Sequence, residues 1–152
     1  MSMVARLEAL ALRPDDELRA LAERASGAGA IVSFTGLARP ASRGGLTVYR
    51  LVLEHHPALT QQSLEEIAAE AAARFDVNHV RVAHRCGDIA AGEPIVFAGA
   101  AALHRRAAFE AADYLMDRLK TEAVFWKREI GQSGSEWIEP ADADYSDRER
   151  WG

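Results

Sequence analysis

The feature that most constrains the fold is one nearly all-apolar segment, EPIVFAGAAAL, at residues 93–103. Its longest apolar run covers residues 95–103. That is far short of the ~20 residues that a membrane-spanning helix needs. A strand that is apolar on both faces is typical of the interior of a sheet, where other elements cover both sides. We therefore predict a central strand here, within a single water-soluble domain that spans residues 1–152.

Helical periodicity marks a first segment before this strand, at residues 13–26. We expect its cap at Asp15 or Asp16, because aspartate accepts hydrogen bonds from the free N–H groups of a first turn. The apolar stripe of this helix is expected to be Leu18, Leu21 and Ala22.

Two further helices are expected. The second follows Pro57 and can begin at that proline, at Thr60, or at the capping-box pair Ser63 and Glu66. The third covers residues 104–120, directly after the apolar strand. Its expected buried face consists of Phe109, Ala112, Leu115, Met116 and Leu119.

Strand composition recurs in four other segments, at residues 30–36, 46–55, 79–87 and 123–130. A turn at residues 131–135 then leads into the short segment EWIE. This order of elements predicts an α+β fold in which helices pack against one face of a largely antiparallel sheet. Beyond about residue 139 the chain is polar and acidic, which predicts a loosely held tail.

The net charge of -5 is concentrated at the C-terminal end. Residues 129–152 contain seven acidic residues and two arginines, so residues 1–128 are balanced, with sixteen acidic and sixteen basic residues. The chain therefore has no surplus of positive charge for binding a nucleic-acid backbone. Any site for an anion must be local.

Cysteine and histidine usage gives little support for a metal or cofactor, and we expect neither. The single cysteine, Cys86, excludes an internal disulfide and a cysteine-rich metal site. His55 and His56 lack a third ligand with suitable spacing, so a structural role at a strand end is favoured. The charges at Arg6 and Glu8 lie where a signal peptide would be apolar, which predicts a cytoplasmic protein.

Lysine is the rarest charged residue in the chain. Lys120 and Lys127 are its only lysines, whereas sixteen residues are arginine. Lysine can transfer a proton or act as a nucleophile near neutral pH, and arginine cannot. Strand alternation places Lys127 on one face with Phe125 and Glu129, where apolar neighbours would lower its pKa. The two lysines therefore predict a site that needs titratable amines. The alternative stays open that both lysines are there by chance and that Lys120 only caps the end of a helix.

Three other cations are candidate anion ligands. His104 and Arg105 fall at the start of the third helix, where free N–H groups favour a phosphate or carboxylate. Arg39 lies in the glycine-containing loop at residues 36–45 and can bind an oxyanion with two nitrogen atoms. Each of these residues could instead be solvated. Arg43 is a weaker candidate, and Arg106 is expected to point outward.

With these positions identified, the chain resembles the large, catalytic subunit family of molybdopterin synthase. The segments that carry the resemblance are VSFTGLAR, LEHHPALT, VAHRCGDIAAGEPIVFAGAAALHRRAAFEAADYLMDRLKTEAVFWKRE and the final RW. The resemblance implies an α/β hammerhead fold and a homodimer. It also implies a heterotetramer, in which the homodimer binds two small subunits of ubiquitin-like fold.

The resemblance further implies a sulfurtransferase that acts in molybdenum cofactor biosynthesis. Sulfur from the thiocarboxylated Gly-Gly tail of the small subunit is transferred to cyclic pyranopterin monophosphate (precursor Z), and two rounds build the dithiolene of molybdopterin. The family pattern implies catalytic roles for Lys120 and Lys127, and no sulfur-carrier role for Cys86. The substrate-binding positions that it implies are Leu37, Ala38, Arg39, His104, Arg105, Lys120, Lys127, Arg128 and Glu129.

We expect Lys120 to transfer protons and Lys127 to hold substrate or tail by its charge. Whether Arg43 joins the pocket, and whether the site is completed across the dimer, stay open at this point. Two rival functions also remain: a dimeric scaffold that binds an anion without chemistry, and a small phosphate-ester hydrolase. Neither rival needs two amines, so the lysine pair favours the synthase.

Overall fold

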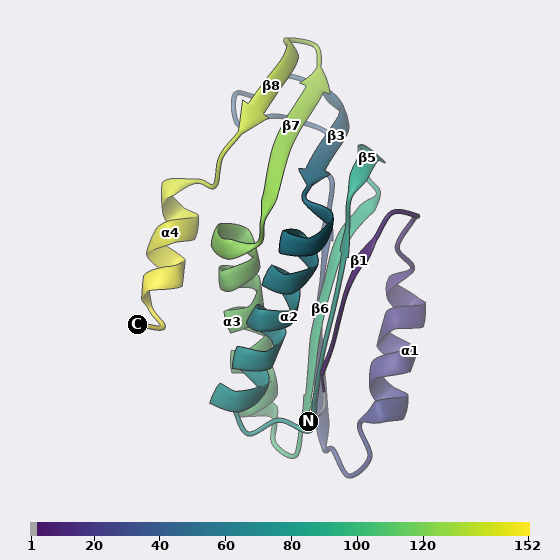
Figure 1. Ribbon diagram of the computed structural model, residues 1–152, viewed down its shortest axis with the longest axis vertical. Helices are drawn as coiled ribbons and strands as arrows, with labels where there is room; N and C mark the ends of the chain where they lie inside the picture. The colour runs from purple at the N-terminus through teal and green to yellow at the C-terminus, as the bar shows by residue number, and fades with distance from the viewer. Residues whose placement is uncertain (1–2) are drawn as a thin grey trace.

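The chain forms two four-stranded sheets and four helices, as a computed structural model describes it for residues 3–152 (Figure 1). The elements in chain order are β1 (Met3–Glu8), α1 (Pro14–Arg24), β2 (Ala30–Leu37), β3 (Val48–His55), α2 (Pro57–Arg74), β4 (His79–Arg85), β5 (Gly87–Ala90), β6 (Pro94–Ala102), α3 (Arg105–Glu122), β7 (Phe125–Gly131), β8 (Gly134–Ile138) and α4 (Asp142–Glu149). The helices within the described residues include none that is long and apolar enough to cross a bilayer.

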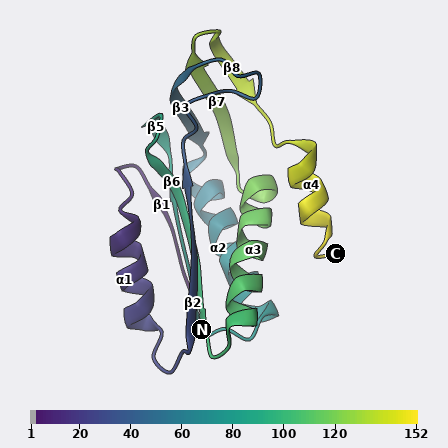
Figure 2. The same cartoon turned by 180° about the vertical axis from the view of Figure 1, so that it is seen from behind.

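The larger sheet has the strand order β1-β4-β6-β2, in which only β1 and β4 are parallel. The all-apolar strand, β6, is interior as predicted, because it pairs with β4 on one side and β2 on the other. The α+β class and the largely antiparallel pairing are confirmed. The helices differ from the prediction because they cover both faces: α2 and α3 lie on one side and α1 lies on the other (Figures 1 and 2).

The smaller sheet, of order β5-β3-β7-β8, extends beyond one end of the larger one (Figure 1). In this sheet β7 pairs with β3 and β8, so that Lys127 lies opposite Leu53 on one side and Ile138 on the other. The predicted alternation along β7 is confirmed: Trp126 is 52% exposed, whereas Phe125 and Lys127 face a cavity.

The first helix differs in detail from its sequence-based prediction. It begins at Pro14, and Arg13 at the N-cap makes no side-chain capping bond, so neither predicted aspartate caps it. Leu21 is fully buried as expected, but Leu18 and Ala22 are exposed. Fewer apolar residues of α1 are buried than expected because ion pairs, as well as apolar contacts, hold this helix against the sheet.

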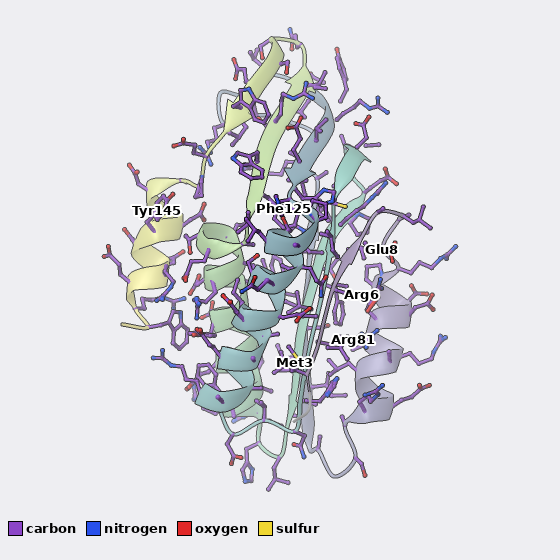
Figure 3. All side chains as sticks on the ribbon, viewed as in Figure 1. Met3, Arg6, Glu8, Arg81, Phe125 and Tyr145 are labelled. Atoms are coloured by element: carbon purple, nitrogen blue, oxygen red, sulfur yellow. The ribbon has the colours of Figure 1, made fainter. Side chains whose placement is uncertain are left out.

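That charge is the carboxylate of Glu17, which is buried on the sheet side of α1. It pairs with Arg6 of β1 and accepts a hydrogen bond of 2.7 Å from Arg81 of β4. Arg6 also pairs with Glu8, and Figure 3 shows Arg6, Glu8 and Arg81 close together beside α1. The charges at the N-terminus thus belong to a strand, β1, which the sequence analysis did not predict.

The second and third helices resolve two alternatives. Among the three predicted starts of α2 the proline is correct, and the His56 ring caps the helix by accepting the Leu59 N–H at 3.1 Å. In α3, Leu115 and Leu119 are buried as predicted, but Phe109 is 59% exposed. The helix instead turns small alanines toward the sheet, which lets its backbone approach closely.

The loosely held tail predicted beyond residue 139 is instead largely helical, because α4 packs along α3. Trp151 anchors it: the indole ring packs edge-on against Tyr114 and Phe75, with centroids 5.5 Å and 5.7 Å away. Its Nε1 donates a 2.7 Å hydrogen bond to Asp117, which also accepts one from Arg150 at 2.5 Å. A single aromatic residue and ion pairs therefore hold a segment that has little apolar surface of its own.

Replacing Trp151 with phenylalanine should destabilise the protein by about 1.5 kcal/mol, since it removes a hydrogen bond to a carboxylate and keeps most of the ring contact. Urea unfolding would measure this change. Trp137→Phe is the matched control, because Trp137 is exposed and should tolerate the replacement with little change. Equal stability of the two variants would contradict the anchoring role of Trp151.

Candidate functional site

A cavity of about 420 Å³ lies beside several of the predicted site residues. It lies among β7, the end of α3 and the start of α4, and Phe125 and Tyr145, labelled in Figure 3, belong to its wall. Apolar side chains such as Leu53 and Ile138 form part of this wall. Its charged residues are Arg39, Arg43, Lys120, Lys127 and Asp144.

A smaller cavity of about 210 Å³ lies at β2, the edge strand of the larger sheet. Its wall includes Leu37 and Glu129. The two spaces adjoin, because they share the apolar residues Ile95, Val96 and Met116 and the cations Arg39, Lys120 and Lys127. The structure thus brings together both lysines and the loop arginine, which come from three separate elements of the chain.

Local folding explains how each of the three cations comes to lie at the boundary between the two cavities. Lys127 is carried inward by the alternation of β7, and Lys120 lies in the last turn of α3. Arg39 follows Ala38, which is 1% exposed and fixes the loop by two backbone bonds: its N–H donates to Glu93 at 2.8 Å, and its carbonyl accepts from Gly92 at 2.7 Å. Ala38 therefore positions Arg39.

The pKa of Lys127 is lowered from its ordinary value of 10.5 to about 8. The main cause is burial, which disfavours the charged amine, and the positive charges of Lys120 and Arg39 act in the same direction. The carboxylate of Asp144 opposes them. The direction of this shift is the one expected from the sequence, and a pKa near 8 suits an amine that exchanges protons near neutral pH.

Lysine side-chain NMR can test this pKa directly, since the chain holds only two lysines to assign. Lys127 should titrate near pH 8; Arg39→Ala should raise that pKa, and Asp144→Asn should lower it further. Because the folded protein binds fewer protons than the unfolded chain between pH 8 and 10.5, stability should rise with pH across this window. An ordinary pKa for Lys127 would contradict the assignment.

The larger cavity also contains a histidine that the sequence analysis did not single out. His84, at the end of β4, packs its ring against Phe125 with centroids 4.3 Å apart. Burial and the nearby charges of Lys127 and Lys120 lower its pKa to about 4, so the ring is neutral at physiological pH. Only the juxtaposition of β4 and β7 identifies this residue, and no spacing in the sequence indicates it.

Several predicted site residues lie elsewhere in the single chain. His104 and Arg105 are exposed at the start of α3, whereas Lys120 is near its other end, roughly 22 Å away along the helix. Arg128 points to the opposite face of β7, where it contacts Ser135 at 3.1 Å and Trp137. A single protomer therefore does not assemble the full predicted set.

The remaining candidates take different places. Arg43 lines the larger cavity and donates a 2.7 Å bond to the carbonyl of Glu139, so it links the pocket to the segment before α4. Arg106 is exposed. Cys86 is buried, burial raises the pKa of its thiol, and it lines neither cavity. Within residues 3–152, no three His, Cys, Asp or Glu side chains are grouped as metal ligands.

Residues 8–122 match the protein family described as MoaE protein. The molybdopterin synthase catalytic subunit of Pseudomonas aeruginosa is 42% identical over 149 residues, which cover 98% of this chain and 99% of the relative. The chain belongs to the molybdopterin synthase catalytic subunit family. The member from Caulobacter vibrioides is 50% identical over 123 residues, covering 81% of this chain and 80% of the relative.

Solved structures of the family share the fold. Molybdopterin cofactor biosynthesis protein E from Burkholderia multivorans superposes with a TM-score of 0.83 at 33% identity, covering 100% of this chain and 98% of that one. A Helicobacter pylori structure, a complex of subunits 1 and 2 of molybdopterin-converting factor, has a TM-score of 0.71 at 22% identity and covers 90% of each chain. The expected family and α+β fold are thereby confirmed.

Proposed function

We propose that this protein, as a molybdopterin synthase catalytic subunit, transfers sulfur from the thiocarboxylated Gly-Gly tail of a small ubiquitin-like subunit to cyclic pyranopterin monophosphate. The observation that carries the proposal is the meeting of two cavities at Arg39, Lys120 and Lys127. A transfer between two anionic reactants requires two adjoining spaces with cations at their boundary. A simple hydrolase would require only one space.

The smaller cavity is the proposed site of the pterin, because its wall includes the predicted substrate-binding residues Leu37, Arg39 and Glu129. The larger cavity is the proposed site of the tail. Its apolar wall suits an extended peptide, and its cations suit the thiocarboxylate. Sulfur would then bond to the pterin at the boundary, beside both lysines.

The residues of this boundary have complementary proposed roles. Arg39 and Lys120 stabilise the negative charge that develops on the acyl oxygen and on the phosphate. Lys127, with its pKa lowered to about 8, donates a proton to the pterin oxygen that leaves when sulfur bonds. Ala38 holds the Arg39 loop in place, and Arg128 supports β7 from its outer face.

A second copy of the chain is the proposed source of His104 and Arg105. These side chains are exposed and too far along α3 to reach Lys120 of their own protomer. The β2 edge beside the smaller cavity carries exposed apolar residues, Phe34 and Leu37, on a strand with an unpaired side. Apolar edge strands are normally covered, so we infer a homodimer that closes the smaller cavity and adds these two basic side chains.

The small subunit is the proposed second partner, and the complex from Helicobacter pylori supports a partnership of this kind. Two copies would bind one homodimer, giving a heterotetramer. The protein is expected to work in the cytoplasm without a metal or cofactor of its own. Precursor Z is the substrate and not a resident group.

The decisive experiment mixes the purified protein with thiocarboxylated small subunit and precursor Z, and measures molybdopterin by mass spectrometry. Formation of the dithiolene only when all three components are present is the expected result. Release of inorganic phosphate without the small subunit would favour the hydrolase. Binding of both reactants with no product would favour the scaffold.

A further inference from the structure

His84 is a titratable residue of the larger cavity that has no role in the reaction proposed above. It ends β4, and its ring lies flat against Phe125 at an interplanar angle of 29°. Its Nδ1 lies 2.9 Å from the carbonyl oxygen of Arg85. Because a carbonyl can only accept, Nδ1 carries the proton and donates it, which fixes the tautomer.

This tautomer leaves Nε2 with a free lone pair on a ring that lines the cavity. Most of the other ionisable side chains around the proposed tail site are lysines and arginines, and these cannot accept a proton while they are protonated. Asp144 is the other base in the wall, but its carboxylate already accepts the Ala141 N–H at 2.9 Å, at the start of α4. His84 is therefore the best-placed neutral base in the larger cavity.

The proposed reaction needs such a base once per sulfur. After sulfur bonds to the pterin, the small subunit is still attached through an acyl–sulfur bond, and water must cleave this bond to release the tail. We propose that Nε2 of His84 is the general base for this hydrolysis; the inference rests on the proposed function and adds a residue to it.

The water oxygen bonds to the acyl carbon while Nε2 takes one of its protons. The acyl carbon–sulfur bond then breaks with its electron pair left on sulfur, and the imidazolium gives its proton to that sulfur. The products are a pterin thiol and a small subunit with an ordinary carboxylic acid terminus. No oxidant or reductant is required.

The surroundings of His84 make its basicity depend on the substrate. Burial is the main cause of the low pKa of the ring, and the charges of Lys127 and Lys120 lower it further. The phosphate of the bound pterin offsets these charges, so the ring becomes a stronger base when the substrate is present. Stacking on Phe125 and the bond to Arg85 hold it in orientation, which limits the cost of reorganisation.

His84→Asn tests the proposal, because the asparagine amide can still donate to the Arg85 carbonyl but cannot act as a base. Turnover should fall by roughly 10²–10⁴-fold. A covalent conjugate of small subunit and pterin should accumulate and be visible by intact mass spectrometry. His56→Asn is the matched control: His56 only caps α2, asparagine caps well, and turnover should be retained.

A second variant covers the case in which asparagine disturbs the wall. In His84→Ala, free imidazole added to the buffer should restore part of the turnover, whereas it should not restore Lys127→Ala. Near-normal turnover in His84→Asn would overturn the proposal, as would lost turnover with neither conjugate nor imidazole rescue. If the unaltered protein makes no molybdopterin, the proposed function itself fails, so the two failures are distinguishable.

Discussion

Replacing Lys127 with arginine is expected to lower turnover by roughly 10²–10⁴-fold, the usual contribution of a positioned acid or base. Lys120→Arg should lower it less, because Lys120 acts by its charge. Arginine keeps the positive charge at the boundary between the cavities but cannot release a proton near neutral pH. The loss of turnover in Lys127→Arg would be small if Lys127 only held the substrate by its positive charge. Its pKa of about 8 instead allows it to transfer a proton near neutral pH, so we expect the large loss.

Steady-state formation of molybdopterin would measure both variants, with binding of the small subunit as the control for folding. The pH profile then distinguishes the lysines: an inflection near pH 8 should disappear in Lys127→Arg and persist, with lower amplitude, in Lys120→Arg. Turnover close to normal in Lys127→Arg would mean that charge alone suffices at that position.

Mixing two inactive variants is expected to restore activity. In a homodimer whose site takes Lys120 from one protomer and Arg105 from the other, a hybrid of Lys120→Ala and Arg105→Ala has one intact site and one doubly altered site. Random reassortment of equal amounts should therefore recover roughly a quarter of the normal activity, as closed two-fold symmetry requires.

The control is a mixture of Lys120→Ala with Lys127→Ala. Both residues belong to the same protomer's boundary, so each hybrid has one defect in each of its two sites and should regain no activity. By contrast, Lys120→Ala,Lys127→Ala mixed with Arg105→Ala should recover as well as the single pair does. If Arg105→Ala,Lys120→Ala mixed with unaltered protein loses no activity beyond dilution, the shared site is wrong.

How far the sequence predicts this molecule depends on the range of the interactions involved. The apolar strand β6 and the inward face of Lys127 follow from local patterns, and both are confirmed. The exposed Phe109 was not predictable from periodicity, because helical spacing does not distinguish the stripe that packs from its neighbour. The family resemblance predicted that Arg39, Lys120 and Lys127 belong to one site. Their spacing in the sequence alone could not show that they meet at the boundary between the two cavities.

The other features that the sequence did not predict all depend on contacts between residues far apart in the chain. The segment of α4 looks polar in sequence, since its stability comes from Trp151 and from charges on α3. Strand β1 is ordered by pairing with β4, more than seventy residues later. His84 is ordinary in sequence and becomes notable only where β4 meets β7.

The larger sheet separates α1 from the rest of the molecule, and this has a practical consequence. Gly99 of β6 faces α1 so closely that a Cβ there would lie 2.7 Å from Leu21. The two cavities lie among β7, α3 and the β2 edge, and no residue of α1 lines either of them. A dye or surface tether attached at exposed Arg19 of α1 would therefore report on the complete assembly, or immobilise it, while leaving both reactants free to enter.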